Sequence, residues 1–477
     1  MFASRWSGWI VAATFYLFDV FLRLTVDVIT SELQAEFHLS ADAVTAAFSA
    51  SFFYAYAAMQ LPTGFLLDVL GPRWTIILSS LLSSVGCVLF SYAETATLGT
   101  VARALSGIGC GCGWLGAVKV TRNSFGIRDS QFTRAIFAVT CMLGGVGGLI
   151  SQEPFQLLVT AVGWRVAFRV AAIIPVCIAC CSFFFVSNVA HQAAPPLDPG
   201  TIEDPLLLAF PSTVVAAAAA ADDDDATDAL MSEHHELPVP SSWSVLQRCL
   251  RTPRMWAYAM YLGGTDAPFE TFAGLWGVTF LHQVYEWSKS QAAAATTVVV
   301  VLSTVAQIFS GTLMGYVTSM HARLRVMTAL SLLGFISFLP FVLAPLGKTS
   351  PPGGDGVAYG ALISLGLSVA SCTIIWSIIS SDALCAGTAS TGIVSGAVNT
   401  LCIFYDAVVQ QVTGAVLSAT WNGQTNAAKE PVYDAHAFSR AFMVLAGSFV
   451  LATGASVFVS FSMHGKRNGQ TRRDGIL

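Results

Sequence analysis

Charged side chains are scarce in this sequence: Asp, Glu, Lys and Arg make up 11% of its 477 residues, against about 25% in typical soluble domains. No Asn-x-Ser/Thr acceptor occurs, and none of the eleven cysteines falls in a predicted outer loop, so we expect free thiols and no disulfide framework. No metal-ligand cluster or nucleophile–base pair lies outside the apolar segments. These gaps argue against a soluble domain, a disulfide scaffold and an enzyme, and we expect neither a cofactor nor a metal.

Long apolar runs are what the sequence has instead, with 55% hydrophobic residues and a mean hydropathy of +0.66. A helix rises about 1.5 Å per residue, so about 20 apolar residues cross the ~30 Å hydrocarbon core of a bilayer. Runs of this length predict an all-α membrane protein with twelve transmembrane helices, at residues 8–29, 43–66, 74–94, 97–120, 134–158, 165–188, 255–281, 292–316, 326–346, 357–380, 391–417 and 438–462.

A long polar insert separates the sixth run from the seventh, which divides the helices into six plus six. The insert contains a run of alanines and four adjacent aspartates, so it cannot bury a core and is predicted to be disordered, except for a short amphipathic helix at 242–253. The predicted parts are a first bundle at 1–188, a cytoplasmic linker at 189–253, a second bundle at 254–465 and a cytoplasmic tail at 466–477.

Lys and Arg residues set the predicted orientation in the membrane. If the N-terminus is cytoplasmic, 15 of them fall in cytoplasmic segments and 6 on the opposite side. Because cytoplasmic loops carry an excess of Lys and Arg, both termini and the linker are expected in the cytoplasm.

The first apolar run carries Asp19, Arg23 and Asp27, although a membrane helix normally holds no charge. An ionised group near the middle of a bilayer costs at least ~2.5 kcal/mol and is tolerated only beside a partner or a watery cavity. The spacing i, i+4, i+8 places all three on one face of the helix. That face is therefore expected to point towards a hydrated interior.

The seventh run contains Asp266 and Glu270, again one helical turn apart. Two such acids should not both be ionised without a cation nearby, so we expect one to hold a proton or the pair to bind a cation. A buried acid tied to a neighbouring helix is the alternative. Glu153 in the fifth run faces either the cavity or the outer surface, and Asp406 in the eleventh run is a weaker candidate for the same chemistry.

The loop after the second run reads GFLLDVLGPRW, with Gly64, Asp68, Gly71 and Arg73 at defined spacing. Gly64 permits close approach of another helix. Asp68 can meet the positive N-terminus of a helix, and Arg73 can pair with Asp68 across the turn. The corresponding segment of the second half, GTLMGYVTSMHAR, has no acid at the matching place.

This Gly-x-x-x-Asp-x-x-Gly-x-Arg pattern resembles the signature of the major facilitator superfamily. FLRLTVDVI, RALSGIGCGCGW and GWRVAF add similarity to a branch with bacterial organic-solute permeases and eukaryotic lysosomal dipeptide transporters, and to the anion:cation symporters. The resemblance implies two pseudo-symmetric six-helix bundles around a central cavity and transport by alternating access. It also implies that Gly64, Asp68, Gly71 and Arg73 gate the cytoplasmic end, and that Arg103 faces the cavity. An interfacial arginine is the alternative for Arg103.

The charge balance within the membrane favours a zwitterionic or cationic solute, such as a dipeptide or amino acid, with proton coupling as an open possibility. Arg23 and Arg103 would bind an acidic group, and Tyr54 and Trp376 would line the path. The predicted cation or proton sites are Asp19, Asp27, Glu153, Asp266 and Glu270. The alternatives are an organic-anion/cation symporter, a uniporter whose acids are structural, and a nutrient receptor that does not transport.

The linker contains Glu203, Leu207 and Leu208 in the order of an acidic-dileucine sorting signal, which cytosolic adaptors bind. The pattern predicts a lysosomal or vacuolar membrane, with the plasma membrane as the alternative. The expected partners are therefore the lipid bilayer, a small solute, protons and sorting adaptors, and no nucleic acid.

Overall fold

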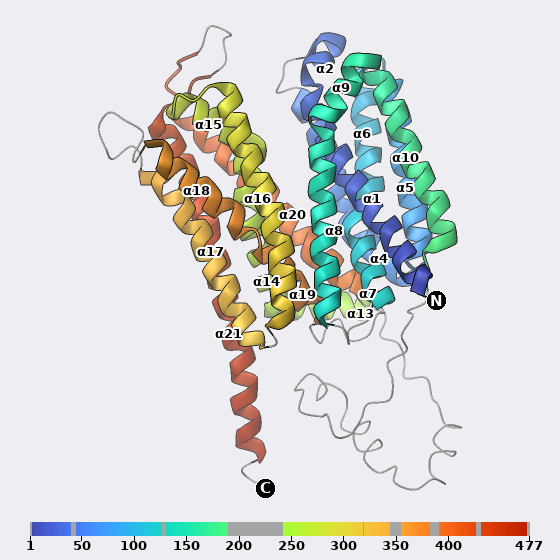
Figure 1. The fold of residues 1–477 in the computed structure, drawn as a ribbon, viewed down its shortest axis with the longest axis vertical. Helices are drawn as coiled ribbons and strands as arrows, with labels where there is room; N and C mark the ends of the chain where they lie inside the picture. The colour runs from blue at the N-terminus through green and yellow to red at the C-terminus, as the bar shows by residue number, and fades with distance from the viewer. Residues whose placement is uncertain are drawn as a thin grey trace.

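The structure is a computed structural model, and every element that it describes is helical apart from one isolated bridge between Thr425 and Pro431. Helices follow one another as membrane-crossing rods in two groups that stand side by side (Figure 1). The described residues are 2–39, 44–125, 130–188, 242–317, 319–343, 354–381, 391–425 and 431–474.

The first group contains six rods, and several of them are built from two consecutive helices. These helices are α1 (Phe2–Val28) with α2 (Thr30–Phe37), the π-helix η1 (Thr45–Ser49) with α4 (Ala50–Val69), α5 (Pro72–Ser91), α6 (Ala96–Cys110) with α7 (Gly113–Phe125), α8 (Ser130–Ser151) with α9 (Glu153–Val162), and α10 (Trp164–Phe185).

The second group also contains six rods, preceded by the amphipathic helix α13 (Ser242–Arg251) that the sequence predicts. These helices are α14 (Pro253–Thr271) with the π-helix η4 (Phe272–Trp276) and α15 (Gly277–Val284), α16 (Lys289–Tyr316), α17 (Met320–Leu343), α18 (Gly354–Ser368) with α19 (Ser371–Ser381), α20 (Thr391–Thr420), and α21 (Ala435–Asp474).

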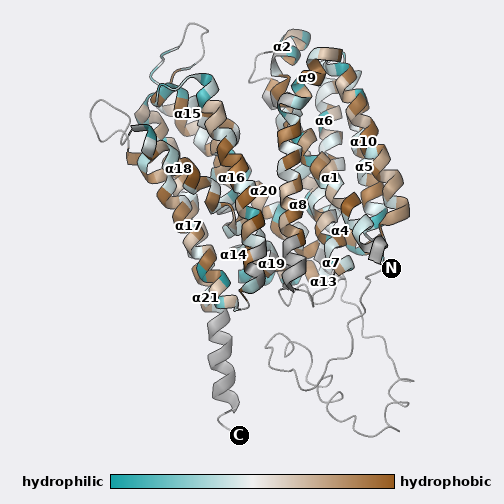
Figure 2. Cartoon of the chain, in the orientation of Figure 1, coloured by the Kyte–Doolittle hydropathy of each residue, from teal (hydrophilic) through white to brown (hydrophobic). Residues whose placement is uncertain are grey.

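Within the described residues, ten of the twelve rods are long and apolar enough to cross a membrane by length and composition alone. The other two contain α4 and α14. Hydrophobic residues predominate along the rods of both groups (Figure 2). The twelve predicted transmembrane helices are therefore confirmed, although α21 continues as a helix to Asp474, beyond the predicted end at 462.

The two bundles touch closely where α4 meets α20 and where α8 meets α16. Gly64 makes the first contact possible, because a Cβ atom there would collide with the carbonyl oxygen of Gly392 and would lie 3.3 Å from Cα of Gly396. Towards the end that carries α2 and α15 the bundles diverge, whereas α13 and both chain termini lie towards the other end (Figure 1).

Candidate functional site

A buried carboxylate and a guanidinium occupy the middle of α1. The side chain of Asp19 is 0% exposed, and its Oδ2 lies 3.5 Å from Nη2 of Arg23. The hydroxyl of Tyr56 on α4 donates to the same oxygen over 3.4 Å, and the Arg23 guanidinium lies 5.0 Å from the centre of the Tyr56 ring. Gly113 makes room for this carboxylate, because a Cβ atom there would lie 2.7 Å from Oδ2. Oδ1 of Asp19 has no hydrogen-bond partner among the described residues.

Arg23 reaches from the first bundle towards the second. Its side chain is 21% exposed, and it interacts electrostatically with Glu270 as well as with Asp19. Asp266 and Asp406 also interact electrostatically with Arg23. The guanidinium therefore interacts electrostatically with one acid of its own bundle and with three acids of the other.

The acids of the second bundle form a compact group. Potential ligand atoms of Asp266 on α14 and of Cys402 and Asp406 on α20 all lie within 4.8 Å of one another. Sγ of Cys402 lies 3.9 Å from Oδ2 of Asp406. Within the described chain, neither these two acids nor Glu270, one turn beyond Asp266, has a basic group within ion-pair distance. Two carboxylates and a thiol are groups that can hold a cation.

The sequence analysis placed little weight on Asp406 and none on Cys402. These two residues are separated by four positions on one helix, a signal that was readable from the sequence. Their proximity to Asp266 depends on which face of α20 packs against α14. The sequence of neither helix specifies that face.

Arg103 lies elsewhere than expected. Its side chain is 0% exposed, and it donates from Nε to the carbonyl of Phe48 and from Nη1 to the carbonyl of Leu22, each over 3.2 Å. The guanidinium also lies 4.6 Å from the centre of the Phe52 ring. These contacts correct the expectation that Arg103 faces the central cavity or snorkels to the interface: it is enclosed within the first bundle.

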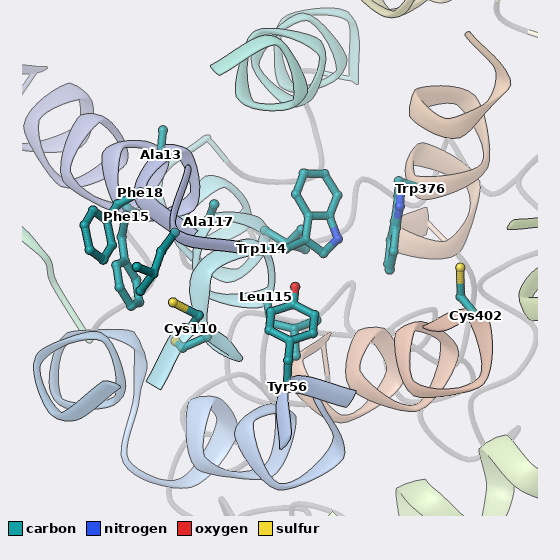
Figure 3. Packing of buried hydrophobic residues seen from close by; sticks show 14 of the residues in the cluster. Ala13, Phe15, Phe18, Tyr56, Cys110, Trp114, Leu115, Ala117, Trp376 and Cys402 are labelled. Atoms are coloured by element: carbon teal, nitrogen blue, oxygen red, sulfur yellow. The ribbon is translucent and has the colours of Figure 1, made fainter. Parts of the chain in front are cut away.

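Two tryptophans meet between the bundles. Trp376 on α19 is 3% exposed, and its ring centre lies 5.4 Å from that of Trp114 on α7 in an edge-to-face arrangement. Figure 3 shows the two side chains facing one another near the hydroxyl of Tyr56. Tyr54 is 58% exposed and accepts a hydrogen bond of 3.0 Å from Gln411 on α20. The sequence analysis selected Trp376 and Tyr54 but did not identify Trp114.

Some predicted residues cannot be placed. The side chains of Asp27 and Glu153, and the linker residues Glu203, Leu207 and Leu208, lie outside the described part of the structure.

At the end where the bundles touch, Asp68 joins them. Its carboxylate accepts hydrogen bonds from the backbone N–H groups of Gly392 (3.0 Å) and Ile393 (2.8 Å) in the first turn of α20, where the helix dipole favours a negative charge. Nζ of Lys119 lies 2.6 Å from Oδ1 of the same side chain. Burial raises the pKa of Asp68 above its ordinary value, although the charge of Lys119 lowers it.

Arg73 is not the partner that the turn geometry predicted for Asp68. Its Nε donates to the carbonyl of Val186, and its backbone N–H donates to Asn188 over 2.9 Å, so it ties the loop to the end of α10. Gly71 adopts φ +80, in the left-handed region, and a Cβ atom there would lie 2.6 Å from the Asn188 side chain. Lys119, which the sequence analysis did not select, is the ion-pair partner of Asp68.

A polar centre between two helical bundles that touch at one end is typical of transporters that work by alternating access. The family model of the Major Facilitator Superfamily matches residues 8–404, and the chain belongs to this superfamily.

Solved structures of this superfamily share the fold. The fucose transporter FucP in the outward conformation has a TM-score of 0.64 at 14% identity, with 95% of this chain and 99% of that chain covered. The human organic anion transporter MFSD10 has a TM-score of 0.61 at 13% identity, with the same coverage.

Curated relatives match shorter stretches. The probable sulfoacetate transporter SauU of Cupriavidus necator is 31% identical over 148 residues, which are 31% of this chain and 34% of that protein. The probable polyol transporter 3 of Arabidopsis thaliana is 29% identical over 113 residues, which are 24% and 22% of the two chains. The chain therefore matches about a third or less of the length of these relatives.

Proposed function

We propose that this chain transports a small zwitterionic or cationic organic solute, such as a dipeptide or amino acid, by alternating access. The observation that carries the proposal is the electrostatic interaction of Arg23, in the first bundle, with Asp266, Glu270 and Asp406 in the second. A solute carboxylate would bind the guanidinium, and a solute ammonium would bind the acids. No covalent chemistry is involved.

Coupling to protons is part of the same proposal. Acids inside a membrane are costly when ionised without a partner, and Asp266, Glu270 and Asp406 have none within ion-pair distance among the described residues. Protons would neutralise them in the empty transporter, and a cationic solute or further protons would do so during transport. Asp19, with its unpartnered Oδ1, is a further candidate for the proton site.

The closed end would be the cytoplasmic one. Both termini lie towards the end where the bundles touch (Figure 1), and the excess of Lys and Arg favours the cytoplasm for that side. The described state would then open outward, with Asp68 latching α4 to α20 and with Gly64, Gly71 and Arg73 shaping the latch.

The first experiment is a thermal-shift screen of the purified protein against amino acids, dipeptides, sugars and organic anions. A ligand that binds only the folded state raises the melting temperature; 100-fold excess over Kd adds about 2.7 kcal/mol. We expect dipeptides or amino acids to stabilise the protein. Stabilisation by sugars alone would contradict the proposed solute class.

The second experiment measures uptake of the stabilising solute into proteoliposomes under an imposed pH gradient. We expect the gradient to drive uptake, and Asp266→Asn with Glu270→Gln to abolish that dependence. Flux that ignores the gradient in both proteins would indicate a uniporter, and specific binding without flux would indicate a receptor.

An organic anion is the second candidate, because Arg23 is a partly exposed cation at the centre and SauU is named as a probable sulfoacetate transporter. A zwitterionic or cationic solute would bind to the acids of the second bundle, whereas a simple organic anion would not. Asp266→Asn should weaken binding of a cationic or zwitterionic solute and leave or strengthen binding of a simple anion.

The location is proposed from the linker signal at Glu203, Leu207 and Leu208. Replacing both leucines with alanine should move the protein from an endolysosomal or vacuolar membrane to the cell surface, as seen by surface biotinylation. An unchanged distribution would show that adaptors do not read the signal.

A further inference from the structure

A groove lies on the outer side of the second bundle, away from the polar centre. It has a volume of about 620 Å³ and is bordered by the end of α13, the first turns of α14 and the middle of α21. Its apolar wall includes Trp256, Met260, Val450 and Phe458. Val450 and Phe458 are separated by eight residues, so the groove extends about 12 Å along α21. This is most of the ~15 Å depth of one leaflet's hydrocarbon.

Gly454 lies in the wall of this groove. A Cβ atom added at Gly454 would meet nothing within 4 Å, so the groove is open in front of this residue and has room for a hydrocarbon chain along α21. Trp256 is 46% exposed in the groove wall and donates from Nε1 to the carbonyl of Leu250 over 2.8 Å. This bond fixes the end of α13 against the start of α14.

Positive charge is confined to one end of the groove. Arg251 lines it, and Arg248 precedes it by three positions on the same side of α13. Both side chains are exposed, and neither forms an ion pair with a described acid. α13 buries Val245 and Cys249 on its other face and exposes Trp243, a residue typical of membrane interfaces.

We propose that this groove binds an anionic glycerophospholipid. The phosphate would lie at Arg251 and Arg248, and one acyl chain would follow the channel past Gly454 towards the middle of the bilayer. Charge at one end of an otherwise apolar channel matches a charged headgroup attached to a hydrocarbon chain. A soluble anion has no hydrocarbon to bury against the apolar wall. A neutral lipid has no net negative charge to interact with the arginines. The proposal does not depend on the identity of the transported solute.

The test is native mass spectrometry of the full-length protein with dioleoyl phosphatidylglycerol and dioleoyl phosphatidylcholine, which share their acyl chains and differ in headgroup charge. We expect the anionic lipid to bind at lower concentration. Each basic residue near a membrane surface contributes about a fivefold factor in affinity. R251Q and R248Q should therefore each weaken binding of phosphatidylglycerol about fivefold and leave phosphatidylcholine unchanged.

Matched variants separate the groove from general effects. Gly454→Leu should fill the channel and reduce binding of both lipids, whereas Gly447→Leu, also in open space on α21 but outside the groove lining, should not. Arg325→Gln, at an exposed arginine on α17, should leave both affinities unchanged. Equal binding of the two lipids by the natural protein, equal effects of R251Q and R325Q, or full displacement by glycerol 3-phosphate would each overturn the proposal.

Discussion

The two bundles hold their intramembrane charges in opposite ways. In the first bundle, two buried acids each have a cation beside them, with Arg23 at 3.5 Å from Asp19 and Lys119 at 2.6 Å from Asp68. In the second bundle, Asp266 and Asp406 lie together with Cys402, and neither these two acids nor Glu270 has a described cation at ion-pair distance. Asp19 and Asp68 of the first bundle are therefore each paired with a cation, whereas the three acids of the second bundle are not, among the described residues.

This difference suggests that the charges of the first bundle support its structure and that those of the second bundle attract a cation. Leaving one buried charge of a pair uncompensated costs about 3–5 kcal/mol, so the paired charges of the first bundle support its structure. The unpaired acids of the second bundle instead favour any cation that enters from outside. Arg23 belongs to both groups, because it pairs with Asp19 and also interacts electrostatically with the acids of the second bundle.

A substitution of Arg23 is expected to have the largest effect on this difference between the bundles. Arg23→Gln removes the cation between Asp19 and the second bundle, and we expect about 3 kcal/mol of lost binding energy, or about a 100-fold increase in Kd of the solute. Isothermal titration calorimetry measures this change. Arg325→Gln, at a distant exposed site, is the control, and a similar Kd in both variants would exclude Arg23 from the solute site.

The second prediction concerns the paired charge at the closed end. Asp68→Asn removes the ion pair with Lys119 and weakens two hydrogen bonds to α20. Hydrogen bonds to charged groups contribute about 1.5–3 kcal/mol each, so the closed end should open more often, by tenfold or more.

A thiol introduced at buried Ser395 on α20 reports this opening through its labelling rate from the side that carries the termini. Glu36→Gln is the matched control, because the Glu36–Arg165 pair is largely exposed and such pairs contribute about 0–1 kcal/mol. Equal labelling in the two variants would show that Asp68 does not hold the bundles together.

The third prediction concerns a contact between the bundles that involves no charged side chain. In Gly64→Ala the new Cβ atom collides with the backbone of α20, and overpacking of this kind costs about 1–3 kcal/mol. The melting temperature should fall, or the Ser395 thiol should label faster. Gly447→Ala on α21 meets nothing within 4 Å and should change neither quantity.

The smallest expected effect is at the aromatic contact. Trp114 and Trp376 should show a coupling of about 0.5–1.5 kcal/mol in a double-mutant cycle with leucine, measured as thermal stability. Additive effects of the two substitutions would mean that this edge-to-face contact does not bind the bundles to each other.

Much of the fold could be predicted because its signals are local. The lengths of the apolar runs predict the twelve spans, and the amphipathic pattern at 242–253 predicts α13, which the structure has at Ser242–Arg251. The spacing within GFLLDVLGPRW identified the superfamily. Each of these patterns lies within one continuous segment, where helical geometry alone relates the residues.

The partners of individual charges could not be predicted in the same way. Asp68 was expected to pair with Arg73, five positions away, but its ion-pair partner Lys119 lies on α7. Arg103 was expected at the cavity, but it bonds to the carbonyls of Phe48 and Leu22. Which face of a helix meets which neighbour depends on rotation and tilt, and these are set by side-chain packing across the bundle.

The π-helical turn η4, at Phe272–Trp276, begins two residues after Glu270. A wider turn of this kind interrupts the regular hydrogen-bond ladder of a span and is frequent at functional sites. We therefore expect α15 to change its angle at this turn while the segment that carries Asp266 and Glu270 stays packed against α20. A rotation of the short helix α15 alone would then be enough to enclose a bound solute. The distance between spin labels on α15 and α9 should therefore change before the distance between labels on α14 and α9 does.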